Sequence, residues 1–134
     1  MLCYDIKKFN DIKSYLKRAN YQWRDRIMRQ YNGRCPITDK WRHVSVHHIS
    51  RSFEDILKET FATTGIEYRP STHQYSLDEL DTLVTTMTAL HRCVTGVVLS
   101  NKVHAEYHNI YGRECTTENW RQFKKLIKSK HKVA

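Results

Sequence analysis

The sequence predicts an α+β fold, in which two short strands accompany a set of amphipathic helices. Two observations indicate the strands. Residues 43–49 alternate β-branched side chains, and residues 96–99 form a short apolar run that leads into a helix. Elsewhere apolar residues recur at helical spacing, which is typical of helices with one buried face. The length of 134 residues suits a single domain, residues 1–134, with its own core.

Two helices are predicted before the first strand. The first covers residues 5–19, where five apolar residues recur at helical spacing: Ile6, Phe9, Ile12, Leu16 and Ala19. Asn20 either ends this helix or caps the next one. The second covers residues 23–31, and Asn32-Gly33 supplies its C-terminal stop. One face of the second helix is apolar and includes Trp23 and Ile27.

The stretch from Cys35 to Lys40 predicts a short strand or knuckle followed by a turn, with Cys35 as a small buried apolar side chain. The four cysteines show neither zinc-binding C-x-x-C spacing nor a secreted disulfide framework. Reduced thiols are the simpler interpretation. The N-terminus lacks the apolar stretch of a signal peptide, and no apolar run could span a membrane. We therefore expect a soluble, intracellular protein without a membrane partner.

Residues 52–93 form a helical insertion between the two strands. Ser52 can cap a helix over residues 53–62, whose expected buried stripe is Phe53, Ile56, Leu57 and Phe61. Residues 63–75, with a glycine and a proline, predict a loop. A capping box from Ser76 to Glu79 then opens another helix. Its expected apolar side is Leu77, Leu80, Val84, Met87 and Leu90, or residues next to these.

Two further helices follow the second strand. Ser100 is a suitable N-cap for the first, and Gly112 ends it. Three of its side chains are expected to face the core: Val103, Tyr107 and Ile110. Thr116 caps a last, basic helix over residues 116–130 with three expected core residues: Trp120, Phe123 and Ile127.

Histidines mark the ends of these elements. His104 and His108 are four residues apart on a helix, so that both lie on one face and can share a cation. His47 and His48 close the first strand, and one of them can complete a set of three imidazole ligands. The other is then free for proton transfer. Strand alternation fits two different roles for this pair but does not assign them. The other histidines, His43, His73, His91 and His131, we interpret as ordinary surface or core residues.

These residues resemble the HNH nucleases, in particular the H-x-x-x-H variant of the colicin-type DNases and small bacteriophage-encoded HNH endonucleases. The resemblance extends over about residues 23–123. It rests on Trp23-Arg24-Asp25-Arg26, Cys35-Pro36-Ile37-Thr38, Val46-His47-His48-Ile49, Ser52-Phe53 and His108-Asn109-Ile110-Tyr111-Gly112. It implies a ββα-metal core at about residues 43–112, in which two short antiparallel strands and the metal-binding helix are surrounded by four to five helices.

The resemblance also implies an activity and residue roles. The activity is metal-dependent endonucleolytic hydrolysis of DNA, which leaves 5′-phosphate and 3′-hydroxyl ends. The implied metal ligands are His47, His104 and His108, and the implied general base is His48. One divalent ion is expected, either zinc, manganese, nickel or magnesium, and the sequence does not determine which. Three imidazoles suit zinc, nickel, cobalt or manganese better than magnesium. A structural zinc site would normally have four protein ligands, and the sequence offers no fourth at useful spacing.

Two positions depart from the family pattern. The family asparagine, nine residues before the first helix histidine, corresponds to Thr95, which cannot bridge two groups as an amide does. Thr95 is therefore the candidate for that catalytic position. The zinc-knuckle C-x-x-C of many family members has Thr38 at its second cysteine, so we expect no structural zinc there.

The charge of +9 favours a nucleic-acid partner. Residues 1–52 carry +8 and residues 91–134 carry +6, whereas residues 53–90 carry −5. The partner expected is double-stranded DNA, with RNA less favoured, in the host cytoplasm if a phage encodes the chain. The candidate phosphate contacts are Arg24, Arg26, Arg29, Arg51, Lys102, Arg113, Lys124, Lys125 and Lys128. For each of Arg24, Arg26 and Arg29 a solvated face is favoured over a phosphate contact, and the C-terminal lysines could equally form a solubilising tail.

Two rival functions are open at this point. A catalytically weak or inactive module could keep the fold and bind DNA. Thr95, in place of the family asparagine, is the feature that would indicate such a module. Alternatively, the metal could stabilise an interaction protein whose basic faces serve only solubility. Sequence specificity, strand preference and oligomeric state are not determined by these patterns.

Overall fold

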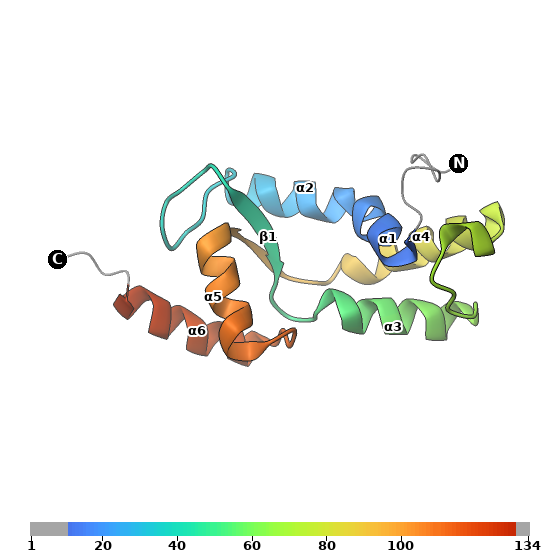
Figure 1. The fold of residues 1–134 in the computed structure, drawn as a ribbon. Helices are drawn as coiled ribbons and strands as arrows, with labels where there is room; N and C mark the ends of the chain where they lie inside the picture. The colour runs from blue at the N-terminus through green and yellow to red at the C-terminus, as the bar shows by residue number, and fades with distance from the viewer. Residues whose placement is uncertain (1–10, 131–134) are drawn as a thin grey trace. The chain divides into compact units, whose positions relative to one another are not determined.

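The computed structural model describes residues 11–130, and the predicted helix positions Ile6 and Phe9, together with Cys3 and His131, lie outside this range. Within it, six α-helices and a two-stranded antiparallel sheet confirm the α+β prediction (Figure 1). The elements are α1 (Ile12–Ala19), α2 (Tyr21–Gln30), β1 (Val44–His48), α3 (Phe53–Thr64), the 3₁₀ turn η2 (Thr72–Gln74), α4 (Leu77–His91), β2 (Gly96–Ser100), α5 (Asn101–Tyr111) and α6 (Thr117–Lys130).

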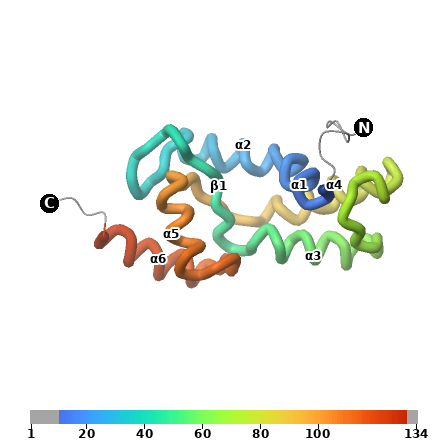
Figure 2. The backbone as a smooth tube through the Cα atoms, in the orientation of Figure 1, coloured from blue at the N-terminus to red at the C-terminus, as the bar shows by residue number. Residues whose placement is uncertain are grey.

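The chain divides into two compact units, each made of two segments. The helical unit comprises residues 1–24 and 55–93, and the sheet unit comprises residues 25–54 and 94–134. The chain leaves the sheet unit after β1, forms most of α3 and all of α4 in the helical unit, and returns just before β2 (Figure 2). The expectation of a single domain stays a prediction. Among the described helices, none has the length and apolar composition needed to cross a membrane.

The helical unit buries apolar rows from α1, α3 and α4. Asp11 caps α1 by accepting a hydrogen bond from the Ser14 N–H at 2.9 Å, and Asn20 ends that helix. The fully buried positions are Ile12, Tyr15 and Leu16 on α1, Ile56 and Leu57 on α3, and Leu80, Leu83 and Met87 on α4.

Two expectations about the insertion need correction. Leu77 is 64% exposed, because it is the first residue of α4 and no helical turn precedes it to shield its side chain. Leu83, the neighbour of Val84, belongs to the buried row of α4, whereas Val84 itself is half-buried. On α3, Phe53 and Phe61 are half-buried, whereas Thr60 is buried and donates its hydroxyl to the Ile56 carbonyl at 2.8 Å.

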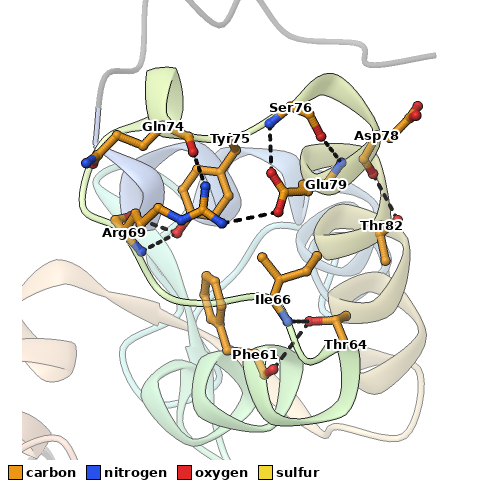
Figure 3. A network of polar contacts seen from close by, with 10 residues as sticks. All are labelled: Phe61, Thr64, Ile66, Arg69, Gln74, Tyr75, Ser76, Asp78, Glu79 and Thr82. Carbon is orange, nitrogen blue, oxygen red and sulfur yellow. Dashed lines mark hydrogen bonds and ion pairs between the residues drawn. The ribbon is translucent and has the colours of Figure 1, made fainter.

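The loop before α4 is held by polar contacts around Arg69 (Figure 3). Its guanidinium pairs with Glu79 at 3.2 Å, donates to the Gln74 carbonyl and lies 4.8 Å from the Tyr75 ring centroid. The Tyr75 hydroxyl donates to the Arg69 carbonyl at 2.7 Å. Glu79 also accepts from the Ser76 N–H, which confirms the predicted capping box. This loop is therefore ordered although it has little regular structure.

The sheet unit is organised around β1 and β2. The strands pair antiparallel with Val44 opposite Ser100 and His48 opposite Gly96, and α5 packs against both. Every residue of β2 is buried. The core also contains Cys35, Ile49, Val103, Tyr107, Cys115, Trp120, Phe123 and Ile127.

The predicted helix ends in the sheet unit are confirmed. Ser100 caps α5 by accepting from the Val103 N–H, and Gly112, at φ +63°, ends it. Thr116 caps α6 by accepting from the Asn119 N–H at 3.0 Å. Ile110 is a wrong prediction, since it is 51% exposed. It lies in the last turn of α5, three residues beyond the buried Tyr107.

The segment after α2 is a turn rather than a strand. Gly33, at φ +68°, donates its N–H to the Met28 carbonyl at 2.8 Å and ends α2 as predicted. The Cys35 N–H then donates to the Lys40 carbonyl at 2.9 Å, and the Asp39 N–H donates to the Cys35 carbonyl at 2.8 Å. Cys35 is fully buried, as expected, and the three described cysteines are free thiols.

Candidate metal centre

His47 points from β1 into the interior of the sheet unit. Its side chain is 1% exposed. Its ring centroid lies 4.2 Å from that of Tyr107, 5.0 Å from that of His104 and 5.4 Å from that of His108, all on α5. Strand alternation explains why the next residue, His48, is only half-buried.

The two helix histidines lie one turn apart and converge. Their Nε2 atoms are 2.9 Å apart, and both side chains are half-buried. One ligand nitrogen from each of His47, His104 and His108 lies within 4.8 Å of the others. The structure therefore brings together the three predicted metal ligands.

Hydrogen bonds fix the far side of both helix imidazoles. His108 Nδ1 lies 2.6 Å from the Gly112 carbonyl oxygen, which can only accept, so Nδ1 carries the proton and Nε2 presents a lone pair. His104 Nδ1 lies 2.7 Å from the Ser45 hydroxyl, which can donate or accept. His104 thus has two tautomers. When Ser45 donates, His104 Nε2 carries the proton and donates it to His108 Nε2 at 2.9 Å. When Ser45 accepts, both Nε2 atoms are bare, and one cation could then bind their two lone pairs.

The buried nitrogen of His47 is the strongest sign of a ligand. Its Nε2 atom is inaccessible to solvent and has no hydrogen-bond partner among the described residues. An unsatisfied buried polar atom costs about 1–3 kcal/mol. A cation held jointly with His104 and His108 would satisfy it.

Burial keeps His47 and His104 neutral, which is the form that binds metals. Burial, followed by the nearby His104, His108 and His48, lowers the pKa of His47 to about 2. Burial, followed by His108, lowers the pKa of His104 to about 4. At neutral pH neither ring has to lose a proton before it can coordinate an ion.

The dimensions fit one ion. A tetrahedral ion with nitrogen ligands at about 2.0–2.1 Å holds those nitrogens about 3.3 Å apart. The separations here, 2.9 Å between the helix nitrogens and at most 4.8 Å within the set, bracket that value. In the described part of the chain the group contains three histidines, so an ion bound to them alone would keep a coordination position for water or substrate.

The loop before β2 is tied directly to the end of β1. The Thr95 carbonyl accepts from the Ile49 N–H at 2.9 Å, and the Thr95 N–H donates to the Ser50 hydroxyl at 3.1 Å. The Thr95 side chain is exposed. Thr95 therefore tethers the chain just beyond His48 through its backbone rather than its hydroxyl.

The candidate DNA contacts differ in the unit they belong to and in their exposure. Arg24 belongs to the helical unit, and the others belong to the sheet unit. Arg26 donates to the Val94 carbonyl at 3.2 Å, and Arg113 pairs with Glu54 at 3.3 Å. The remaining candidates are exposed or half-buried: Arg29, Arg51, Lys102, Lys124, Lys125 and Lys128.

The division into units redistributes the charge. The sheet unit contains 14 basic and 6 acidic side chains, a net +8, and the helical unit carries the remaining +1. The acidic insertion shares its unit with the basic N-terminal segment, so the two largely cancel. Nearly all of the net charge therefore accompanies the three histidines.

Sequence reasoning missed Ser45 and the Gly112 carbonyl, which orient His104 and His108. A signal for Ser45 exists, since it is two residues before His47 and must share its face of the strand. Among the other described histidines, His43 and His73 are exposed, and His91 is a buried residue bonded to the Met87 carbonyl. Comparison with protein-family models, curated proteins and solved structures gives no significant match.

Proposed function

We propose that this protein is a metal-dependent DNA endonuclease of the HNH type. The observation that carries the proposal is the convergence of His47, His104 and His108, with a buried His47 Nε2 that has no hydrogen-bond partner within residues 11–130. The order of strand, strand and helix around these residues agrees with the resemblance in the sequence. The net charge of +8 on the same unit favours a polyanionic substrate.

The three imidazoles would hold one divalent ion. Such an ion stabilises the charge that develops on phosphate oxygens and on the leaving 3′ oxygen. Gly112 and Ser45 orient two of the imidazoles through their Nδ1 atoms. Imidazole donors favour zinc, nickel, cobalt or manganese over magnesium.

His48 is the proposed general base. It follows His47 directly and lies near enough for its charge to lower the pKa of His47. A neutral imidazole nitrogen of His48 would accept the proton of the attacking water. The backbone contacts of Thr95 with Ile49 and Ser50 hold the chain that follows. With one centre per chain, each catalytic event cuts one strand.

Supercoiled plasmid tests the proposal. We expect metal-dependent conversion to nicked or linear DNA, abolished by a chelator and by His104→Ala or His108→Ala. His73→Ala, which removes an exposed histidine of the helical unit, is the matched control and should cleave normally. Cleavage that persists in the chelator, or in both helix variants, would place the activity outside this centre.

A second candidate is a DNA-binding module with weak or no catalysis. It is favoured by Thr95, whose exposed hydroxyl cannot replace a bridging amide. A metal-loaded protein that shifts DNA in a gel without cutting it would favour this candidate. If the protein neither cuts nor shifts DNA, both candidates are wrong.

A further inference from the structure

The loop between α2 and β1 presents an aromatic side chain to solvent. Trp41 is 57% exposed, whereas Trp23 and Trp120 are 5% and 7% exposed. An indole exposed to this extent loses the favourable burial that Trp usually contributes. The Arg42 guanidinium carbon lies 4.6 Å from the Trp41 ring centroid. The loop thus displays a flat aromatic surface with a cation beside it.

This loop has a fixed backbone. Hydrogen bonds between Cys35 and Lys40 close it at one end, and the Asn101 N–H donates to the His43 carbonyl at 2.8 Å at the other. Asp39 and His43 both have left-handed φ angles, +60° and +53°, a conformation that Asp and His adopt more readily than most non-glycine residues. Trp41 is therefore positioned between two anchored ends rather than on a free tip.

Trp41 also lies close to the metal centre. It lies four positions before Ser45, whose hydroxyl contacts His104 at 2.7 Å. Four extended residues span at most about 14 Å. That distance corresponds to about four nucleotide steps of about 3.4 Å along one DNA strand. A strand whose phosphate reached the histidines could thus place a nearby base against the indole.

We infer that Trp41 and Arg42 form a base-stacking contact, and that the preferred substrate is DNA with an unstacked base near the cleaved phosphate, as at a gap or flap. This inference rests on the proposed nuclease function. In intact duplex both faces of each internal base are already stacked, so insertion of an indole costs a few kcal/mol per opened step. At a gap the free base face is available without that cost. The basic character of the sheet unit favours nucleic acid over a protein partner.

Binding measurements in chelator, which prevents metal-dependent cleavage, test this inference. The probes are a fluorescein-labelled duplex with a short single-stranded gap and an intact duplex of the same sequence. We expect tighter binding of the gapped DNA. Loss of one base–aromatic stack in Trp41→Ala should weaken gapped-DNA binding by roughly 5- to 150-fold. Binding of the intact duplex should change by less than about threefold, because no base face is free to stack.

Three comparisons sharpen the test. Trp41→Phe keeps a smaller stacking surface and should lie between wild type and Trp41→Ala. Tyr68→Ala removes a 45% exposed aromatic residue of the helical unit and should bind as wild type. Gapped DNA should quench the emission that Trp41 contributes, whereas Trp23 and Trp120 supply a shielded reference signal.

The outcomes separate this inference from the nuclease proposal. Equal weakening on both DNAs, or none on either, would overturn the stacking contact, while metal-dependent cleavage could still stand. A wild-type protein that binds neither DNA would overturn both. Because Trp41 is exposed, Trp41→Ala should unfold at the wild-type temperature; matched circular-dichroism melts establish that any lost affinity is local.

Discussion

Replacing Ser45 by alanine should weaken metal binding without removing a ligand. The Ser45 hydroxyl lies 2.7 Å from His104 Nδ1, on the side of the ring away from His108. When it accepts the Nδ1 proton, it fixes the tautomer in which His104 Nε2 is a free lone pair. In Ser45→Ala that N–H has lost its acceptor. The alternative tautomer protonates Nε2 and cannot coordinate.

Two estimates of the free energy of metal binding lost in Ser45→Ala agree. A half-buried N–H deprived of its acceptor costs about 1–3 kcal/mol. Changes to groups that support metal-binding histidines typically reduce affinity about 10- to 100-fold, equivalent to about 1.4–2.7 kcal/mol. We therefore expect the metal dissociation constant of Ser45→Ala to rise by about one to two decades. Direct removal of His104 should cost more, since the set of three ligands is then incomplete.

Competition against a chromophoric zinc chelator measures this change. Ser45→Thr keeps a hydroxyl and should recover most of the affinity. Ser129→Ala removes an exposed hydroxyl from α6 and is the matched control. Urea melts of the metal-free proteins separate a local effect from unfolding. If Ser45→Ala and Ser129→Ala bind zinc equally well, the tautomer argument is wrong.

Three other predictions concern the histidines and the basic helix. His48→Ala should retain the metal but cleave plasmid about 10²–10⁴ times more slowly, whereas His47→Ala should lose the metal; the reverse pattern would exchange their roles. Neutralising Lys124, Lys125 and Lys128 together should weaken binding to all DNA sequences and flatten the salt dependence of log affinity by up to about 2.7, at about 0.9 per phosphate contact. An unchanged slope would exclude α6 from the binding surface. In metal-free protein, the His47 pKa of about 2 lies below the unfolded value of about 6.5, so the unfolded state binds more protons between these values. The contribution of His47 to the free energy of unfolding should be constant above pH 6.5. Below pH 6.5 it should fall by up to about 1.4 kcal/mol per pH unit. Urea melts of wild type and His47→Phe at pH 7.5, 6 and 5 measure how the free energy of unfolding changes with pH. If this free energy fell equally steeply in both proteins, the prediction would be wrong.

Local chemistry explains what the sequence predicted well. The caps at Ser76, Ser100 and Thr116 depend on residues within one turn, so their patterns carry nearly all the information. The pairing of His104 with His108 also follows from helical spacing alone. The approach of His47 depends on the register between β1 and β2, which short apolar strands specify through their buried face.

Longer-range features were less accessible. Apolar periodicity indicated which face of a helix is buried but not where along that face the packing partner ends, so Leu77 and Ile110 were wrongly assigned to the core. Residue type alone could not show that Trp41 is exposed whereas Trp23 is buried. Charges summed over sequence segments also differed from the net charge of each unit, because the acidic insertion and the basic N-terminal segment share one unit.

The backbone contacts of Thr95 lead to a last prediction about the asparagine position. Its carbonyl and N–H already bind Ile49 and Ser50, so the tether beyond His48 does not require a side-chain amide. Thr95→Ala keeps both contacts and should cleave within about twofold of wild type. Ser50→Ala removes the acceptor of one contact, worth about 0.5–1.5 kcal/mol, and should slow cleavage about 2- to 10-fold with metal affinity unchanged. Single-turnover rates on plasmid, with Ser129→Ala as control, decide the matter. If Thr95→Ala proved the slower variant, the hydroxyl itself would act at the site, and the backbone tether would not replace the amide.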